Sequence, residues 1–396
     1  MSTDIAVMAD ALFSATTPSF EQYESLAAGA LGRGIDAYTA KDYGTAIREF
    51  RRAIALSPYS ENARSAFEYM ATAQAQSGKT SDAITTYKQA VKVFATDDSL
   101  NLKLGNLYFS NGRYAEALDQ YSAAVRKAPT TTDNVYSLGQ GYLALGRYNE
   151  AETQFKKVIQ LSPQDSAGYY ALGQTYRMAG RYDDALQPLE HALTLNRDFT
   201  YVHFERGMIF AEQQQISKAQ AELAIVKEDA SELAPELQAK ILEKTAPRVI
   251  AAYSANVSLA SKPGTPVSAL DPSLATPLAQ KYFTVNFVFD KEMDASSVQN
   301  IANWSISRSI SFKTGGLYNW DGMISATEVS IAPMPVSVTY RPDMATATVT
   351  FAITQNSSGT GTIDLSHILF KFKGVDVNGN AMDAARDEYS GFSKVV

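Results

Sequence analysis

The chain has 396 residues, which is enough for two or three domains with a sizeable buried core. Hydrophobic residues make up 45% of the sequence and charged residues 19%, a balance that argues against both disorder and membrane insertion. The formal net charge is −7 with no basic stripe, which argues against nucleic acid as the main partner, and the absence of cysteine excludes disulfides, thiolate metal sites and cysteine nucleophiles.

The usual signals for membrane spanning and export are missing from the sequence. No apolar run approaches the roughly 18 residues needed to cross a bilayer. The first basic residue is Arg33, so neither a secretory signal with a charged start nor an Arg-rich transit peptide is expected. By these tests the protein is cytoplasmic or leaves the cell by another route.

Residues 1–26 are predicted to form an N-terminal arm or capping helix. Apolar side chains occupy most positions from Ile5 to Phe13, and Pro18 interrupts this stretch. Two interpretations remain open. The segment covers the start of the helical region that follows, because the end of a stack of repeats needs a cover, or it is an arm that docks into a neighbouring copy of the chain.

A phrase of three residues, Gly-Arg-Tyr, recurs at a constant spacing in the middle of the chain. It begins at Gly112, Gly146 and Gly180, each 34 residues after the last. An alanine follows each glycine five residues later, and a bulky side chain stands four residues beyond the alanine. A fixed period of this length predicts repeated pairs of helices rather than one globular core.

The pattern closely resembles the tetratricopeptide repeat, a helix-turn-helix unit of 34 residues. The best copies cover 98–131, 132–165 and 166–199. Looser copies cover 27–60, about 64–97 and 200 to about 233, and residues 231–244 predict a final helix. The resemblance implies an α-solenoid of about six helix pairs over residues 27–245.

The resemblance also implies how each unit packs. Small residues at the eighth and twentieth positions of the unit, such as Gly139 and Ala151, let its two helices approach closely. A bulky residue at the twenty-fourth position, such as Phe155, fills the space between units. The arginines of the Gly-Arg-Tyr phrase are expected to be solvated in the turn between the helices; they are Arg113, Arg147 and Arg181.

In this family the first helix of each pair lines an inner, concave face, and the fifth, ninth and twelfth positions of the unit point into it. The resemblance therefore implies a groove that binds a partner. Its expected residues are Leu102, Asn106, Phe109, Tyr136, Gln140, Leu143, Tyr170, Gln174, Arg177, Phe204 and Met208. Among them Tyr136, Tyr170 and Phe204 form an aromatic row, and three exposed aromatic side chains in succession predict a contact surface.

The chemistry of these residues favours an apolar protein segment, extended or helical, as the ligand. Amide side chains both donate to and accept from a peptide backbone, and aromatic rings give a large contact area at small entropic cost. An acidic C-terminal tail does not fit, since only Arg177 lies at a position where chaperone-binding members of the family carry basic residues. The alternative is that these positions are tolerant and bind nothing.

After Lys244 the sequence changes from helical to strand patterns. Apolar and polar residues alternate in 283–289, 336–340 and 347–353, and 367–375 adds a further strand. Several short strands separated by polar loops predict an antiparallel β-sandwich over residues 246–396. The expected fold class is thus a multidomain α plus β chain.

The stretch 287–306 resembles the bacterial Ig-like domain of surface-layer proteins and adhesins. Its members show a strand, a Lys-x-Met-Asp turn, here at Lys291 to Asp294, and an Asn-Trp pair, here Asn303 and Trp304, that enters the next strand. The stretches 336–351 and 373–383 fit the same family, which implies a position at the bacterial surface. Two insertions depart from it, 255–280 and about 307–334, and loops of that size are functional or disordered.

The segment Asp376, Asn378 and Asn380 has the spacing of the start of an EF-hand calcium loop. Gly379 comes one position too early and no bidentate glutamate follows, so a tight turn is expected instead of a calcium site. Neither a metal nor a cofactor is predicted.

Catalysis is not expected from the sequence. The three histidines, His191, His203 and His367, show no pairing with a carboxylate or a second histidine at ligand spacing. Phosphate-binding loops, nucleophile elbows and dinucleotide fingerprints are also absent. The sequence therefore predicts a protein that is not an enzyme.

Two functions follow as hypotheses. In the first, the chain is an interaction scaffold or adaptor that grips a protein or peptide partner in the repeat groove, with the Ig-like domain as spacer or anchor. In the second, it is a self-assembling structural protein of a bacterial surface or extracellular assembly, a homo-oligomer or filament in which the N-terminal arm occupies a neighbour's groove. The Ig-like resemblance favours the cell surface or the exterior, reached without a classical signal peptide, and the missing signal favours the cytoplasm.

Overall fold

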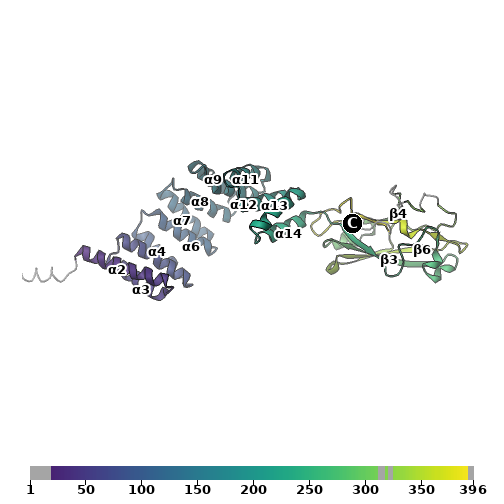
Figure 1. Cartoon of the computed structure of the whole chain (residues 1–396), viewed down its shortest axis with the longest axis horizontal. Helices are drawn as coiled ribbons and strands as arrows, with labels where there is room; N and C mark the ends of the chain where they lie inside the picture. The colour runs from purple at the N-terminus through teal and green to yellow at the C-terminus, as the bar shows by residue number, and fades with distance from the viewer. Residues whose placement is uncertain (1–18, 311–316, 320–323, 391–396) are drawn as a thin grey trace, which may run out of the picture. The chain divides into compact units, whose positions relative to one another are not determined.

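The computed structural model describes residues 19–310, 317–319 and 324–390. By their contacts the residues divide into two compact units, Met1–Ile209 with Ala224–Ser231, and Phe210–Leu223 with Glu232–Val396. Figure 1 shows helices through the purple and teal part of the chain and strands through the green and yellow part. Within the described ranges, none of the helices is both long and apolar enough to span a membrane.

The helical part begins at Phe20, seven residues before the predicted start of the repeats, because Ser19 caps the first helix in a reciprocal pair of hydrogen bonds with Gln22. The predicted arm at 1–18 lies outside the described residues. The helices are α2 (Phe20–Thr39), α3 (Tyr43–Leu56), α4 (Glu61–Gln76), α5 (Thr80–Val93), α6 (Asp98–Ser110), α7 (Tyr114–Lys127), α8 (Thr132–Ala144), α9 (Tyr148–Leu161), α10 (Ser166–Met178), α11 (Tyr182–Leu195), α12 (Thr200–Glu212), α13 (Ile216–Asp229) and α14 (Ala234–Lys244).

A left-handed residue ends the first helix of each pair. In the turn after α6, the N–H of Gly112 donates to the carbonyl of Phe109 (3.0 Å) and that of Arg113 to the carbonyl of Tyr108 (3.0 Å), which is a Schellman motif. The glycines at this place are Gly78, Gly112, Gly146 and Gly180, with φ of +78°, +73°, +69° and +74°. Lys41 and Gln214 fill the same place with φ of 60° and 58°, so two of the turns carry a side chain where glycine fits best.

The two helices of a pair touch through a glycine and a bulky residue. A Cβ added to Gly139 on α8 would lie 2.6 Å from the ring of Phe155 on α9, and one added to Gly105 would lie 2.5 Å from Tyr121. Gly34 with Phe50 and Gly173 with Leu189 show the same arrangement. The predicted packing of small against large residues is therefore observed, with Ala151 and Phe155 fully buried.

The strands form antiparallel sheets in the orders β1-β3-β6-β5, β4-β8-β9 and β2-β7. Their bounds are β1 (Val249–Tyr253), β2 (Thr265–Pro266), β3 (Gln280–Phe289), β4 (Trp304–Arg308), β5 (Ser337–Arg341), β6 (Thr346–Thr354), β7 (Thr362–Ile363), β8 (Ile368–Phe372) and β9 (Glu388–Ser390). The connections carry the helix α15 (Ala295–Gln299) and the 3₁₀ turns Val267–Ala269, Pro272–Ala275, Ile301–Asn303, Pro342–Met344 and Leu365–His367.

The two larger sheets pack face to face over one core. Alternate residues of β3 and β6 point inward, as their sequence pattern predicts. Phe287 of β3 and Phe351 of β6 lie 5.6 and 5.4 Å from the ring of Phe370 on β8. The predicted β-rich region is thus present, and its kinship with Ig-like domains stays a prediction.

The insertion 255–280 contributes to this core. It carries β2 and two 3₁₀ turns, and its Val267 and Leu274 are completely buried. The second insertion, about 307–334, lies partly outside the described residues, but its Tyr318 and Val329 are also buried in the core. Both predicted insertions therefore supply core residues as well as loops.

Candidate protein-binding groove

The eleven predicted groove residues all lie on the first helices of their pairs, α6, α8, α10 and α12. The residues of α6, α8 and α10 come close enough for direct contact between successive first helices. This shared surface is called the first-helix face below. Its aromatic side chains on α8 and α10, Tyr136 and Tyr170, are partly exposed and stand 34 residues apart.

Burial separates the predicted groove residues into two groups. Partly or fully exposed members are Leu102, Asn106, Phe109, Tyr136, Gln140, Tyr170, Gln174 and Arg177. Leu143, Phe204 and Met208 are 5%, 7% and 6% exposed, which leaves almost no surface for a partner. The predicted row of three exposed aromatic side chains is therefore wrong at Phe204, and Tyr136 and Tyr170 remain.

The predicted ladder of amides is engaged with tyrosine hydroxyl groups. Gln140 Nε2 donates to the hydroxyl of Tyr136 at 3.2 Å, and Gln174 Nε2 donates to that of Tyr170 at the same distance. A tyrosine and a glutamine four residues apart lie on one side of a helix, so this pairing was readable from the sequence but was missed. Each amide fixes a ring on the first-helix face, which leaves less of it for a ligand backbone.

Asn106 is held by a residue outside the predicted set. The Tyr121 hydroxyl on α7 donates to Asn106 Oδ1 at 2.8 Å. Burial raises the pKa of Tyr121 to about 12, and it also raises the pKa of Tyr136 above the usual range. These hydroxyl groups therefore stay neutral and keep their hydrogen bonds at any physiological pH.

A buried carboxylate on α12 organises the C-terminal end of this face. Glu205 is 1% exposed and accepts a hydrogen bond of 2.8 Å from Gln174. Arg177 pairs with the other oxygen of the same carboxylate. Burial, followed by the charge of Glu205, raises the pKa of Tyr170 far above its ordinary value. Arg177 is thus committed to an internal partner, and Glu205 is a member of the site that the position rules did not include.

The arginines of the Gly-Arg-Tyr phrase do more than contact solvent, contrary to the prediction. The guanidinium of Arg113 lies 4.7 Å from the ring centre of Tyr108 and 2.6 Å from a carboxylate oxygen of Glu116. Arg147 stacks on Tyr142 at 4.7 Å and Arg181 on Tyr176 at 4.3 Å. Because the turn places each arginine directly before the second helix, it can bridge the tyrosine of the first helix and an acid in the first turn of the second.

A pocket of about 680 Å³ opens away from the predicted groove residues, between α9, α10 and α11. Its walls include Ile159, Leu172 and Pro188, with Tyr169 and His191 in ring contact at 4.3 Å. His191 is thus packed against an aromatic side chain.

His367 does pair with a carboxylate, contrary to the prediction, and it ends a 3₁₀ turn instead of beginning a strand. Its Nδ1 lies 2.5 Å from Asp364 Oδ2, while Ser366 donates to the other oxygen of Asp364 at 2.6 Å. His367 and Asp364 are both completely buried, so a substrate has no access to them. Nearby, the Tyr318 hydroxyl donates to Glu328.

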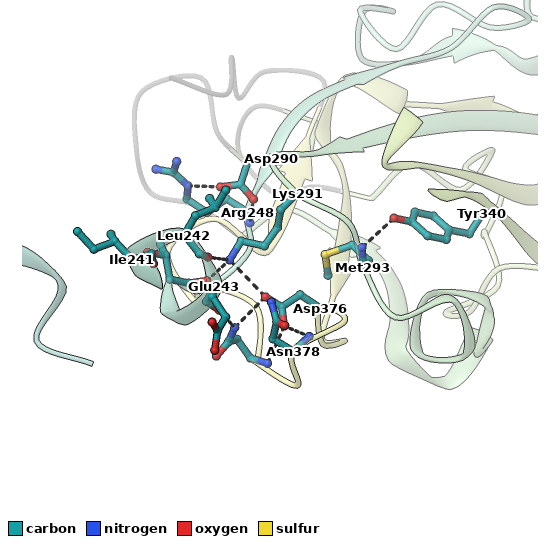
Figure 2. A network of polar contacts seen from close by, with 12 residues as sticks. Ile241, Leu242, Glu243, Arg248, Asp290, Lys291, Met293, Tyr340, Asp376 and Asn378 are labelled. Atoms are coloured by element: carbon teal, nitrogen blue, oxygen red, sulfur yellow. Dashed lines mark hydrogen bonds and ion pairs between the residues drawn. The ribbon is translucent and has the colours of Figure 1, made fainter. Parts of the chain in front are cut away.

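Neither of the remaining polar groups forms a metal site. Asp376 accepts hydrogen bonds from the backbone of Asn378 and Asn380 and from the side chains of Asn380 and Lys291 (Figure 2). A lysine amine beside the carboxylate repels a cation, so the loop is a turn. Within the described ranges, no group of three or more His, Asp or Glu side chains is placed to hold a metal ion.

Residues 131–198 and 70–130 each match a family model of the tetratricopeptide repeat. Among solved structures, a tetratricopeptide repeat protein from Parabacteroides merdae ATCC 43184 is similar, with 18% identity and a TM-score of 0.50 over 55% of this chain and 86% of that chain. MamA is 22% identical, with a TM-score of 0.39 over 43% of this chain and 92% of that chain. YrrB, described as a TPR protein with an unusual peptide-binding site, is 19% identical, with a TM-score of 0.39 over 48% and 97%.

A comparison with functionally described proteins found no match. The family models confirm the predicted repeats over residues 70–198, and the first of the solved structures confirms the helical fold. Repeats of this kind generally mediate interactions between proteins, and no catalytic family is indicated.

Proposed function

We propose that this chain, whose residues 70–198 are tetratricopeptide repeats, is a scaffold that binds an apolar protein segment on its first-helix face. The observation that carries the proposal is the matched pair of Tyr136 and Tyr170. Each ring is partly exposed, each hydroxyl is fixed by a glutamine one turn away, and the two rings repeat with the period of the units. Two rings held in advance lose little entropy when a ligand binds.

Leu102 and Phe109 extend the apolar surface onto α6, where both pack partly against the core. An apolar stretch of a partner, extended or helical, would contact these side chains and the tyrosine rings. Arg177 contributes little to recognition in this scheme, because Glu205 already neutralises it. The β region, with the kinship to Ig-like domains of surface proteins inferred from its sequence, would serve as spacer or anchor at the cell surface.

The test is selection of ligands from a displayed library of random peptides on the full chain. We expect enriched apolar peptides that bind the unmodified chain and lose at least tenfold in affinity for the double variant Tyr136→Ser, Tyr170→Ser. The control is Tyr59→Ser, because Tyr59 lies between α3 and α4 and is 81% exposed. Circular dichroism checks that the helices persist. Equal affinity for the double variant would place the binding site elsewhere.

A second candidate function is self-assembly, which the exposed start of α2 favours. Phe20, Tyr23 and Leu26 are 73%, 38% and 49% exposed and recur every three residues, an apolar surface at the first described helix. Light scattering on the full chain and on a chain without residues 1–18, which keeps the Ser19 cap, separates the two. A mass that falls on truncation supports self-assembly through the predicted arm, and an unchanged mass argues against it.

A further inference from the structure

The last helix, α14, ends against loops of the β region, and these loops take up its free carbonyl groups. The final turn of a helix leaves carbonyls without a partner in the helix. Lys291 Nζ donates to the carbonyl of Leu242 at 2.5 Å and to that of Thr245, and Asn380 Nδ2 donates to the carbonyl of Glu243 at 2.6 Å (Figure 2). A cation at this place also faces the negative end of the helix dipole.

Lys291 is fixed from its other side by Asp376. The two side chains are 8% and 0% exposed, and Nζ lies 3.3 Å from Oδ2 of the carboxylate. The backbone N–H groups of Asn378 and Asn380 hold the second oxygen of Asp376 at 2.9 and 2.8 Å. A buried charge that loses its partner is strongly destabilising, so this pair can form only while the helix end and the loop are in place together.

The segment that joins α14 to the first strand makes contacts throughout. Arg248 donates from N and Nε to the carboxylate of Asp290 at 2.9 and 3.0 Å, and the N–H of Asp290 donates back to the carbonyl of Arg248 at 3.1 Å. The carbonyl of Pro247 accepts from the N–H of Asp383 at 2.9 Å. Linkers between independent domains are exposed and make few contacts, and this segment does not behave as one.

The other side of α14 is tied to the end of α12. Lys240 and Lys244 lie 3.2 and 2.9 Å from the two oxygens of Glu212. All of these residues belong to the second compact unit of the chain. Helix α14 therefore has partners along its length as well as at its end.

We propose that α14 and the β region form one rigid body, and that Lys291 is the lock that holds them together. The strands then keep a fixed direction relative to α14 and do not swing on a tether. The proposal is independent of what the repeats bind, since none of the residues on the first-helix face takes part in it.

The absence of cysteine from the chain allows a direct test on the full-length protein. Spin labels attached to Glu236→Cys on α14 and Thr339→Cys on β5, both exposed positions, report the distance between helix and sheet by pulsed electron paramagnetic resonance. We expect one narrow distance distribution in the otherwise unchanged chain. Lys291→Met should widen it at least twofold.

The matched control is Lys281→Met, because Lys281 pairs with Asp271 at 3.1 Å on the surface of the same region and is 46% exposed. It should leave the distribution unchanged. A broad distribution in the labelled chain without further changes would overturn the rigid body. A distribution that stays narrow in Lys291→Met would overturn the role of Lys291.

A second variant keeps the test decisive if Lys291→Met does not fold. Asp376→Asn preserves the shape of the side chain and removes the charge that pairs with Lys291. Fluorescence of Trp304, which is buried in the β core, checks that this region is intact. Broadening with an unchanged Trp304 spectrum supports the lock, and the width of the unmodified chain in Asp376→Asn refutes it.

Discussion

Gln174 on α10 donates a hydrogen bond of 2.8 Å to Glu205 on α12, a carboxylate that is only 1% exposed. The bond joins the first helices of two successive repeats, and Arg177 supplies the compensating charge. The position rules of the repeat point to Gln174 and Arg177 but not to Glu205. The three side chains form one polar cluster beneath the predicted groove.

Removing the charge of Arg177 should destabilise the helical part. Arg177→Met leaves the Glu205 carboxylate buried without a counter-charge, so we expect the free energy of unfolding to fall by about 3–5 kcal/mol. The double variant Arg177→Met, Glu205→Met buries no charge and should regain most of this loss. Urea unfolding followed by circular dichroism measures both. A double variant as unstable as the single one would contradict the explanation.

Enlarging a small contact residue should also destabilise the repeats. Ala151 is completely buried on α9, and we expect Ala151→Leu to cost about 1–3 kcal/mol by overpacking. Ala115→Leu is the control, because Ala115 lies exposed on α7. Thermal melting of the two variants is the measurement. If Ala151→Leu melts no lower than the control, the register of the repeats is wrong.

The turn after α12 offers a stabilising substitution. Gln214 adopts a φ of 58°, a region where a side chain costs energy and where the equivalent residue of three repeats is glycine. Gln214→Gly should raise the free energy of unfolding by about 0.5–1 kcal/mol. The reverse change, Gly146→Gln, should lower it by a similar amount. Opposite signs in chemical unfolding are required, and equal signs would rule out the conformational cause.

Stability of the β region should fall as the pH rises through neutrality. Burial raises the pKa of Glu328 from 4.5 to about 7, although the charge of Arg308 opposes the shift. The folded state therefore binds the proton more tightly than the unfolded state, and this contribution is complete below about pH 4.5 and lost as the pH passes about 7.

Tryptophan fluorescence is the appropriate measurement for this pH effect, because both tryptophans, Trp304 and Trp320, belong to the β region of the sequence. We expect a lower melting temperature at pH 8 than at pH 6. Glu328→Gln cannot ionise and should weaken this dependence. An identical slope in Glu328→Gln would show that other groups cause it.

Much of the fold follows from patterns that repeat along the sequence. The 34-residue spacing predicted the helix pairs, because the glycine in each turn and the close contact of Gly139 with Phe155 both need a specific residue at a fixed place. Alternation predicted the strands β3 and β6 for the same reason, since every second residue enters one core. Such local requirements leave a record in the sequence.

Burial across elements leaves a weaker record. Phe204 has the same position in its unit as Tyr136 and Tyr170, yet it is buried, because exposure depends on what packs over a helix and not on the period. His367 and Asp364 are three residues apart, but only the 3₁₀ turn between them brings Nδ1 to the carboxylate. The pair of Lys291 and Asp376 joins residues 85 apart, and no local pattern announces it.

The order in which the chain folds follows from where the last helix finds its partners. Each helix pair is closed by contacts between neighbours in sequence, whereas β3 pairs with β6 more than fifty residues later. Contacts over short stretches of chain form faster than distant ones, and residues made first on the ribosome can fold first. Helix α14 obtains its terminal hydrogen-bond donors from Lys291 and Asn380, so the solenoid end is completed only after the strands have been synthesised and assembled.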